Sequence, residues 1–283
     1  MKRFLTALAL ASIAFSGAAD AKDFKAGSKV RIATEGAYAP WNFTDSSGKL
    51  AGFEVDLYAD LCERMSVQCD LVQTAWEGII PALQAGKFDA IMAGMSITDK
   101  RKKVITFSRS YMGSPASFVV LKASPLASLS AGMDNLTLAD VDAKEEAGLD
   151  SMKAALKGKT IGVQISTTHE NFLNEYMGDT VTVKTYDTQE NLDLDLVAGR
   201  IDAALASLSY WVPLLEGEKG KTMAMVGPKM DGGPFGNGVG AGIRKDDQEL
   251  ADMFTKAIDE ARADGTISKL SIQWFGFDGT PKE

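Results

Sequence analysis

The sequence has few of the residues that usually hold metal ions, with one histidine and two cysteines among 283 residues. Metal sites built from cysteine and histidine place their ligands at short, regular spacings. No histidine and no second cysteine pair stands at such a spacing from Cys62 and Cys69. The sequence therefore predicts neither a metal site nor any other cofactor.

The chain also lacks an excess of positive charge. Its 30 lysines and arginines stand against 38 aspartates and glutamates, which gives a formal net charge of −8. Proteins that bind nucleic acid or acidic membrane surfaces usually present a basic face. Neither kind of partner is expected for this chain.

Long apolar runs are missing except near the N-terminus. Residues 1–21 begin with a positively charged "MKR", continue with an apolar stretch, and end with Ala19 and Ala21 as small residues before a cleavage site. A membrane anchor is the alternative, but the apolar stretch is shorter than the roughly 20 residues that a membrane span requires. The pattern is typical of a secretory signal peptide cleaved near Ala21, and it predicts a periplasmic protein.

The two cysteines stand seven positions apart, between a helix-like and a strand-like stretch. An exported chain meets an oxidising compartment, where disulfides form and persist. A bridge between Cys62 and Cys69 would join the end of a helix to the following strand. Two free thiols are the alternative.

The rest of the chain has a globular composition, with 45% hydrophobic and 24% charged residues, and is long enough for two medium-sized cores. Apolar spacing alternates between the periods of strands and helices. This alternation predicts α/β units with parallel strands. In the first unit we expect strands at 69–75 and 88–96 and helices at 52–65 and 76–87, after an opening strand that breaks at Gly36.

A second unit begins near Gly158 and ends before a glycine-rich stretch. Its expected strands are 159–166, 180–187 and 200–209, and its expected helices are 167–177 and 188–199, the first with Thr167 or Thr168 near its N-cap. Residues 123–157 are predicted to form an insertion on the surface of this unit, with at least one helix.

The glycine-rich stretch 231–247 has neither the GxGxxG spacing nor the Gly-Lys-Ser/Thr ending of a phosphate-binding loop. A flexible crossover between two lobes is therefore expected there. Two helices are predicted within 248–276.

The two units repeat one pattern. Residues 79–96 can be laid over residues 192–209, and both give a helix, Ala-Gly, a basic residue, Asp-Ala and an apolar strand. Chance similarity is the alternative. If the repeat is real, Ser96 and Ser207 face a shared cleft, because ligands of open α/β sheets bind outside the carboxyl ends of strands.

Several motifs together resemble one family. They are "EGAYAPWNF", "GFEVDLYADLCERM", "MSITDKR" followed by a phenylalanine, and "GRIDA". The chain resembles the periplasmic polar-amino-acid-binding proteins of ABC transporters, in particular the lysine/arginine/ornithine, histidine and octopine/nopaline binders. The resemblance covers essentially the whole mature chain, and segment 123–157 departs from it.

The resemblance implies a type II periplasmic-binding-protein fold, in which two lobes with mostly parallel sheets flanked by helices are joined by two crossover strands. The expected division is lobe one at 28–112 and 238–283, lobe two at 116–232, and crossovers at 113–115 and 233–237. Such a protein is a monomer and not an enzyme. It closes on one ligand and delivers it to an inner-membrane permease with a cytoplasmic ATPase.

The family's motifs also imply an anion site. Arg101 matches an arginine that forks onto the α-carboxylate of the ligand, a task that suits its planar guanidinium. Ser96 and Thr168 match further donors to the same carboxylate, Thr168 with help from a helix N-terminus. The alternative for Arg101 is a solvated charge within the cluster Lys100–Lys103.

At the other end of the ligand, Trp76 and Tyr38 match two aromatic walls around an aliphatic or guanidinium chain. Core packing is the alternative for each ring. Glu35 matches an acidic residue that pairs with a cationic distal group.

The departures from the family point to the ligand. Ser207 stands where the family places an acid for the α-ammonium, and an uncharged serine is a poor counter-ion. Ala93 and Gly94 replace residues that are usually serine, which would leave room near the α-carbon. Gln164 would add a hydrogen bond to a second carboxylate. These changes favour an N-substituted amino acid.

We therefore expect an opine of the octopine or nopaline type, with the bulk of Ser96 favouring octopine. A free basic amino acid or histidine is the alternative ligand. A lyase or dehydratase on the same fold is a second alternative, for which Glu35 and His169 are the candidate acid and base. His169 lies beside Thr168 and is either a cleft residue or a surface histidine.

Overall fold

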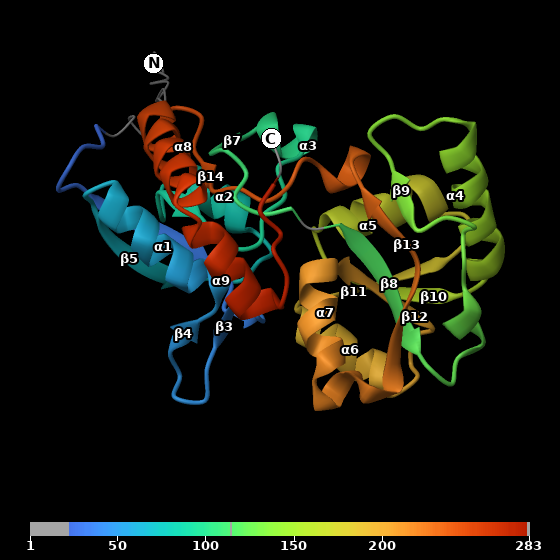
Figure 1. Cartoon of the computed structure of the whole chain (residues 1–283). Coiled ribbons are helices and arrows are strands. Elements are labelled where there is room, and N and C mark those ends of the chain that lie inside the picture. The colour runs from blue at the N-terminus through green and yellow to red at the C-terminus, as the bar shows by residue number, and fades with distance from the viewer. Residues whose placement is uncertain (1–22, 114, 282–283) are drawn as a thin grey trace, which may run out of the picture.

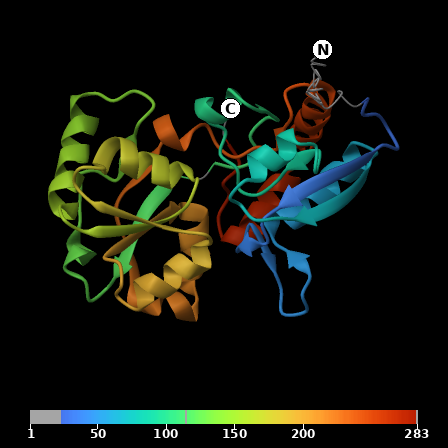
Figure 2. The ribbon, with the colours of Figure 1, turned by 180° about the vertical axis from the view of Figure 1, so that it is seen from behind.

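The computed structural model describes residues 23–113 and 115–281, so the expected signal peptide lies outside the described part of the chain. The described chain forms two lobes side by side, one with β5 (Gln68–Gln73) and α8 (Gln248–Ala263) and the other with β8 (Ala116–Leu121) and α4 (Ala143–Leu156) (Figure 1). The view from behind shows the same two lobes (Figure 2). Within residues 23–113 and 115–281, no helix is long and apolar enough to cross a membrane.

The first lobe contains a five-stranded sheet in the order β5-β1-β6-β14-β7. Its first three strands are parallel, and β14 runs antiparallel to both of its neighbours. The strands are β1 (Lys29–Thr34), β5 (Gln68–Gln73), β6 (Ala90–Ile91), β7 (Thr106–Phe107) and β14 (Gly242–Ile243). A small antiparallel sheet of β2 (Ala37–Tyr38), β3 (Asn42–Thr44) and β4 (Leu50–Ala51) lies beside it.

The second lobe contains a six-stranded sheet in the order β11-β10-β12-β8-β13-β9. The strands β11, β10 and β12 are parallel, and β8 runs antiparallel to β12 and β13. The strands are β8 (Ala116–Leu121), β9 (Asn135–Thr137), β10 (Thr160–Gln164), β11 (Thr182–Tyr186), β12 (Ala203–Ser207) and β13 (Met223–Asp231). The expected parallel units are thus present, each extended by antiparallel strands.

Helices cover the sheets with their apolar sides, and some of them begin at a side-chain cap. In α6, for example, Thr188 accepts a hydrogen bond from the Asn191 amide, and Leu192 and Leu196 are fully buried. The helices are α1 (Phe53–Arg64), α2 (Ile79–Gln84), α3 (Asp99–Lys102), α4 (Ala143–Leu156), α5 (Thr168–Phe172), α6 (Gln189–Val197), α7 (Leu208–Glu216), α8 (Gln248–Ala263) and α9 (Thr266–Phe275).

Short helical turns complete the secondary structure. They are η1 (Pro125–Ser128), η2 (Leu173–Met177), η3 (Glu218–Thr222) and η4 (Gly233–Phe235). The expected helix 167–177 is therefore α5 continued by η2, a π-helical turn, with Thr167 as the N-cap.

Segment 123–157 is more than a surface insertion. It contributes η1, the edge strand β9 and α4, and β9 pairs in parallel with β13. Leu136 and Met152 are fully buried in the core of the second lobe. The prediction of at least one helix is confirmed, whereas the prediction of a purely superficial position is wrong, because the segment supplies core side chains.

The chain passes twice between the lobes, before β8 and after β13 (Figure 1). On the return passage, β13 ends at Asp231 and the next strand is β14 at Gly242–Ile243, while Val239 between them makes isolated bridges with Ser96 and Met112. The C-terminal tail reaches the same place, where the Gly113 amide donates to the Gly279 carbonyl at 2.8 Å.

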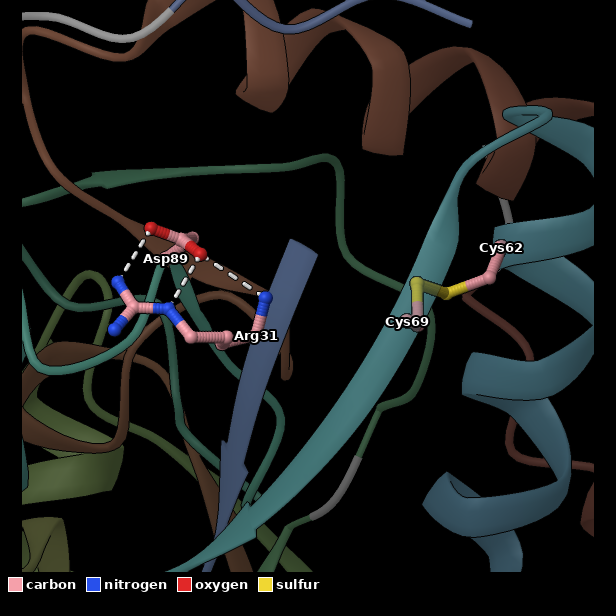
Figure 3. Close-up of a disulfide and its surroundings, with 4 residues drawn as sticks. All are labelled: Arg31, Cys62, Cys69 and Asp89. Carbon is pink, nitrogen blue, oxygen red and sulfur yellow. Dashed lines mark hydrogen bonds and ion pairs between the residues drawn. A yellow bond between two sulfur atoms is a disulfide. The ribbon is translucent and has the colours of Figure 1, made fainter. Parts of the chain in front are cut away.

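The expected disulfide is confirmed. Cys62 near the end of α1 is bonded to Cys69 at the start of β5, as Figure 3 shows. On the neighbouring strand, the Arg31 guanidinium makes a two-point contact with the carboxylate of Asp89, which is buried (Figure 3). The disulfide joins α1 to the sheet, and the contact between Arg31 and Asp89 joins β1 to the residue before β6.

Candidate ligand-binding site

A pocket lies where the carboxyl ends of the strands in both lobes face each other. Its empty space, including the open mouth, is about 420 Å³. All ten side chains expected at the site line it. The lining residues are Glu35, Tyr38, Trp76, Ala93, Gly94, Ser96, Arg101, Gln164, Thr167, Thr168, His169, Gln189 and Ser207.

The fold explains why these residues meet. Ala93, Gly94 and Ser96 follow β6, while Gln164 and Ser207 end β10 and β12. These strands run parallel within their sheets, so their carboxyl ends share one edge of each lobe. The expectation that Ser96 and Ser207 face a shared cleft therefore agrees with the pocket lining.

Arg101 is a buried cation on the pocket wall. Its Nη1 donates to the Ser96 carbonyl at 3.0 Å, and its Nη2 lies 3.4 Å from the Ser166 carbonyl. Its guanidinium carbon lies 5.2 Å from the centre of the Trp76 ring. Burial lowers the pKa of Arg101 to about 10, so the side chain is still charged at neutral pH.

No carboxylate forms an ion pair with Arg101 within residues 23–113 and 115–281. A buried charge without a counter-ion is costly. The neighbouring Lys102 and Lys103 are exposed, in contrast. Arg101 is therefore the member of this basic cluster that is placed to receive an anion.

Glu35 is the only acidic residue among those lining the pocket. Burial raises its pKa to about 7, and a hydrogen bond from Gln164 works in the opposite direction. The Gln164 amide nitrogen donates to Glu35 Oε1 at 2.6 Å and to the Asp187 carbonyl at 3.1 Å. Gln164 thus binds a carboxylate of the protein, and the acceptor Oε1 is the end of its amide left for other contacts.

Two aromatic rings form the walls. The Trp76 indole N–H donates across the lobes to the Ile165 carbonyl at 3.1 Å. One face of Tyr38 stacks on Tyr210 of the second lobe, with ring centres 5.0 Å apart and planes 7° apart. The contact between Tyr38 and Tyr210 could not be predicted from the sequence, because the two residues are far apart in the chain.

Gly94 has a backbone reason for being glycine. Its φ is +63°, a conformation that other residues rarely adopt, and an added Cβ would lie 3.5 Å from the Tyr38 ring, an ordinary contact distance. Its amide donates to both carboxylate oxygens of Glu54, at 2.8 and 3.0 Å. Gly94 therefore has a backbone role as well, and its role in leaving room for the ligand stays a prediction.

Glu54 stabilises the backbone around Gly94. Its buried carboxylate also accepts hydrogen bonds from Tyr111 and from Asn42, the latter at 2.7 Å. Burial raises the pKa of Glu54, and its three donors oppose the rise. The network fixes the backbone that follows β6, from which the pocket residues project.

The N-terminal turn of α5 adds polar groups. Thr167 caps the helix, Thr168 begins it, and both are buried. His169 lies in the pocket lining as well, where burial and the charge of Arg101 lower its pKa to about 3. A neutral imidazole at this position adds no charge to the pocket.

Several hydrogen bonds join the lobes around the pocket. Besides the contacts of Trp76, Arg101 and Gln164, the Trp41 indole N–H donates to Ser209 Oγ at 2.9 Å. Both Trp41 and Ser209 are fully buried. Across residues 23–113 and 115–281, no group of three or more metal-binding side chains comes together.

Two α/β lobes whose strand ends enclose one buried polar pocket define a two-lobed solute-binding protein of the type II periplasmic fold. The family model of the "Bacterial extracellular solute-binding proteins, family 3" matches residues 30–277. The chain belongs to this family.

Its relatives are periplasmic amino-acid-binding and opine-binding proteins. The chain is 41% identical to the octopine-binding periplasmic protein of Rhizobium meliloti, over 89% of this chain and 92% of that one. It is 40% identical to the L-arginine-binding protein of Pseudomonas aeruginosa, over 90% and 91% of the two chains. It is also 37% identical to the histidine-binding periplasmic protein of Salmonella typhimurium, over 98% of each. The expected resemblance is confirmed.

Solved structures agree. An ancestral arginine-binding protein bound to arginine superposes with a TM-score of 0.73 and 30% identity, covering 88% of this chain and 98% of that one. A His/Glu/Gln/Arg/opine family-binding protein from Silicibacter pomeroyi in complex with lysine gives a TM-score of 0.69 at 33% identity. The match covers 89% of this chain and 100% of that one. The chain is therefore a periplasmic amino-acid-binding component of an ABC transporter.

Proposed function

We propose that this protein binds an opine of the octopine type and closes on it for delivery to an ABC importer. Octopine is arginine whose α-nitrogen carries a carboxyethyl group. It has two carboxylates, a secondary ammonium and a guanidinium, so its net charge is zero. The observation that carries the proposal is the charge of the pocket lining: one guanidinium, Arg101, and one carboxylate, Glu35.

The pocket charge favours this ligand over free arginine. Arginine has two cationic groups and one carboxylate, and the pocket lining offers no acid besides Glu35. With Glu35 on the guanidinium, the α-ammonium of arginine would be buried without a counter-ion, which costs free energy. In octopine the second carboxylate lies beside the ammonium and balances it. Nopaline has one carboxylate more and would bring an unpaired negative charge.

Each end of the ligand has a proposed place. Arg101, Ser96 and Thr168 bind the α-carboxylate, and Glu35 binds the guanidinium between Trp76 and Tyr38. Ala93, Gly94, Gln164 and Ser207 surround the substituted amine. This arrangement is supported by the pocket lining, which includes all of these residues.

Closure follows from the lobe arrangement. We assign lobe one to 28–112 and 238–283, lobe two to 116–232, and the hinges to 113–115 and 233–237. A ligand that contacts both lobes stabilises the closed form because it binds that form more tightly. The closed monomer then delivers its ligand to a membrane permease with a cytoplasmic ATPase. The protein acts after removal of the signal peptide near Ala21.

Isothermal titration calorimetry with octopine, nopaline and L-arginine tests the ligand. We expect octopine to bind at least about tenfold more tightly than arginine, equivalent to about 1.4 kcal/mol, and more tightly than nopaline. Equal or tighter binding of arginine would contradict the opine assignment. Mass spectrometry of the ligand after long incubation tests the carrier role, because a dehydratase or lyase would change its mass.

A further inference from the structure

A buried carboxylate that the proposed function leaves unused lies one hydrogen bond behind the pocket. Asp193 of α6 is 9% exposed and is absent from the pocket lining. Its Oδ1 accepts from Gln189 Nε2 at 3.2 Å, and its Oδ2 accepts from the Tyr210 hydroxyl. Gln189 lines the pocket, and Tyr210 stacks on Tyr38, which lines it too.

The bond to Asp193 determines which end of the Gln189 amide is available. A carboxylate accepts hydrogen bonds and cannot donate them when ionised, so it selects the NH₂ group of the amide. Burial raises the pKa of Asp193 to about 6, and the bonds from Tyr210 and Gln189 oppose that rise. At neutral pH the carboxylate is mostly ionised, and the carbonyl oxygen of Gln189 is the end left for another partner.

That oxygen is a free acceptor. Gln189 is 2% exposed, and within the described ranges its Oε1 accepts no hydrogen bond. Ser207, which also lines the pocket, interacts with the Tyr38 hydroxyl, and its side chain and backbone N–H partly offset the rise in the pKa of Tyr38 that burial causes. Gln189, Tyr38 and Ser207 line the pocket, and Asp193 and Tyr210 contact Gln189 and Tyr38 from outside the lining.

We propose that the Gln189 carbonyl oxygen accepts an N–H of the ligand's α-amine, and that Asp193 is a positioning residue that orients this amide. The proposal rests on the proposed function, since it names the group that receives the amine of that ligand. Gln189 is thereby a specificity-determining residue.

The chemistry suits a substituted amine. A neutral carbonyl accepts one N–H of a secondary ammonium without adding a charge to a pocket that Arg101 and Glu35 already balance. The hydrogen bond from Nε2 to the ionised Asp193 polarises the amide, because bonded groups in a low-dielectric interior strengthen one another. Asp193 thus acts on the amine indirectly, by making the Gln189 carbonyl oxygen a stronger acceptor.

The test compares a ligand that has the amine with one that lacks it. L-arginine and 5-guanidinopentanoic acid differ only in the α-amine, and octopine is titrated beside them. In Gln189→Met, which keeps the side-chain length, we expect octopine binding about tenfold weaker or more, as for hydrogen bonds to charged groups. The preference of the wild type for arginine over 5-guanidinopentanoic acid should shrink by a similar factor.

Asp193→Asn should also weaken octopine binding and reduce the preference for arginine over 5-guanidinopentanoic acid. Asparagine can donate to the Gln189 carbonyl, and the NH₂ group of Gln189 would then face the ligand. Glu190→Gln is the matched control, with the same loss of charge on the adjacent exposed residue of α6, and should keep the wild-type preference. Thermal unfolding confirms that each variant is folded.

Two results would overturn the proposal: an unchanged amine preference in Gln189→Met, or equal losses for both members of the ligand pair in Asp193→Asn. The opine assignment is tested separately by the wild-type affinities, and it fails if the wild type binds arginine as tightly as octopine. The amine preference can still be measured in that case.

Discussion

At the scale of single residues, the pocket contains two buried ionisable groups, Arg101 and Glu35. Each is held by its own hydrogen-bond partners. Arg101 is held by backbone carbonyls, and Glu35 is held by the Gln164 amide. Neutral donors and acceptors fix each group in place without neutralising it. Both charges are therefore available to opposite charges on a ligand.

Removing the guanidinium tests the first charge. Arg101→Ala should weaken octopine binding by more than tenfold, because a charge-assisted hydrogen bond to the carboxylate is lost. The fold should be kept, since Arg101 lines a cleft. Lys103→Ala, two residues away and exposed, is the control that should bind normally. Near-wild-type affinity of Arg101→Ala in calorimetry would show that Arg101 does not bind the ligand carboxylate.

The second charge predicts a pH dependence. Glu35 must be ionised to bind a guanidinium, and burial raises its pKa from 4.5 to about 7. Affinity should therefore rise as the pH increases from 5.5 toward 7, by up to about tenfold per unit, and level off above pH 7.5. Titrations at several pH values measure this slope.

Glu35→Gln provides the control for that slope. The variant should bind more weakly at pH 8 and should lose most of the dependence between pH 5.5 and 7.5. Asp193, whose pKa is raised to about 6, leaves a smaller residual slope. A Glu35→Gln protein with the full wild-type slope would show that another group is responsible.

The ten residues expected at the site all line the pocket, because the family motifs stand at fixed places relative to strand ends; their contacts with a ligand stay predictions. Gln189 and Tyr210 could not be predicted from the sequence, since they reach the pocket region through contacts between distant elements. The positive φ of Gly94 was also hidden, because the conformation is set by the bonds to Glu54.

At the scale of elements, the strands of the two parallel units and most helices followed from apolar periodicity and glycine stops, whereas the short and antiparallel strands did not. One of these is β9 at residues 135–137, which is three residues long and has one buried side chain, Leu136. So short a strand has no detectable period, and its pairing with β13 depends on the fold. The expected strand 88–96 shortens to β6 because its later residues turn into the pocket.

At the same scale, the disulfide joins α1 covalently to β5. Replacing Cys62 and Cys69 together by alanine should lower the free energy of unfolding by about 2 kcal/mol, because the unfolded chain regains the freedom of a short loop. Urea unfolding measures the change. Reduction of the wild type with dithiothreitol should give a similar loss, whereas an unchanged midpoint in both experiments would contradict a stabilising role.

At the scale of the whole molecule, the alternation of strands and helices and the family motifs were sufficient to predict two lobes. They did not reveal which bonds join the lobes. These contacts lie partly outside the pocket, as in the bond from Trp41 to Ser209. The stability of the closed form is therefore set in part by residues that the ligand does not reach.

Ser209→Ala tests this remote contribution. Closure would then bury the Trp41 N–H without that acceptor, at a cost of about 1 kcal/mol, so octopine binding should weaken about fivefold. Small-angle scattering should show less compaction at a given ligand concentration. Ser128→Ala, on the surface of the second lobe, is the control. Wild-type affinity of Ser209→Ala would limit control of closure to the pocket itself.

The hydrogen bond between Gly113 and Gly279 has a practical consequence for such experiments. Gly279, four residues from the end of the sequence, is anchored beside the first crossover, so a purification tag or reporter fused to the C-terminus adds mass and charge near the crossover between the lobes. Affinity measured on a C-terminally tagged protein would then include the effect of the tag on lobe motion. A cleavable tag, removed before titration, separates the two effects.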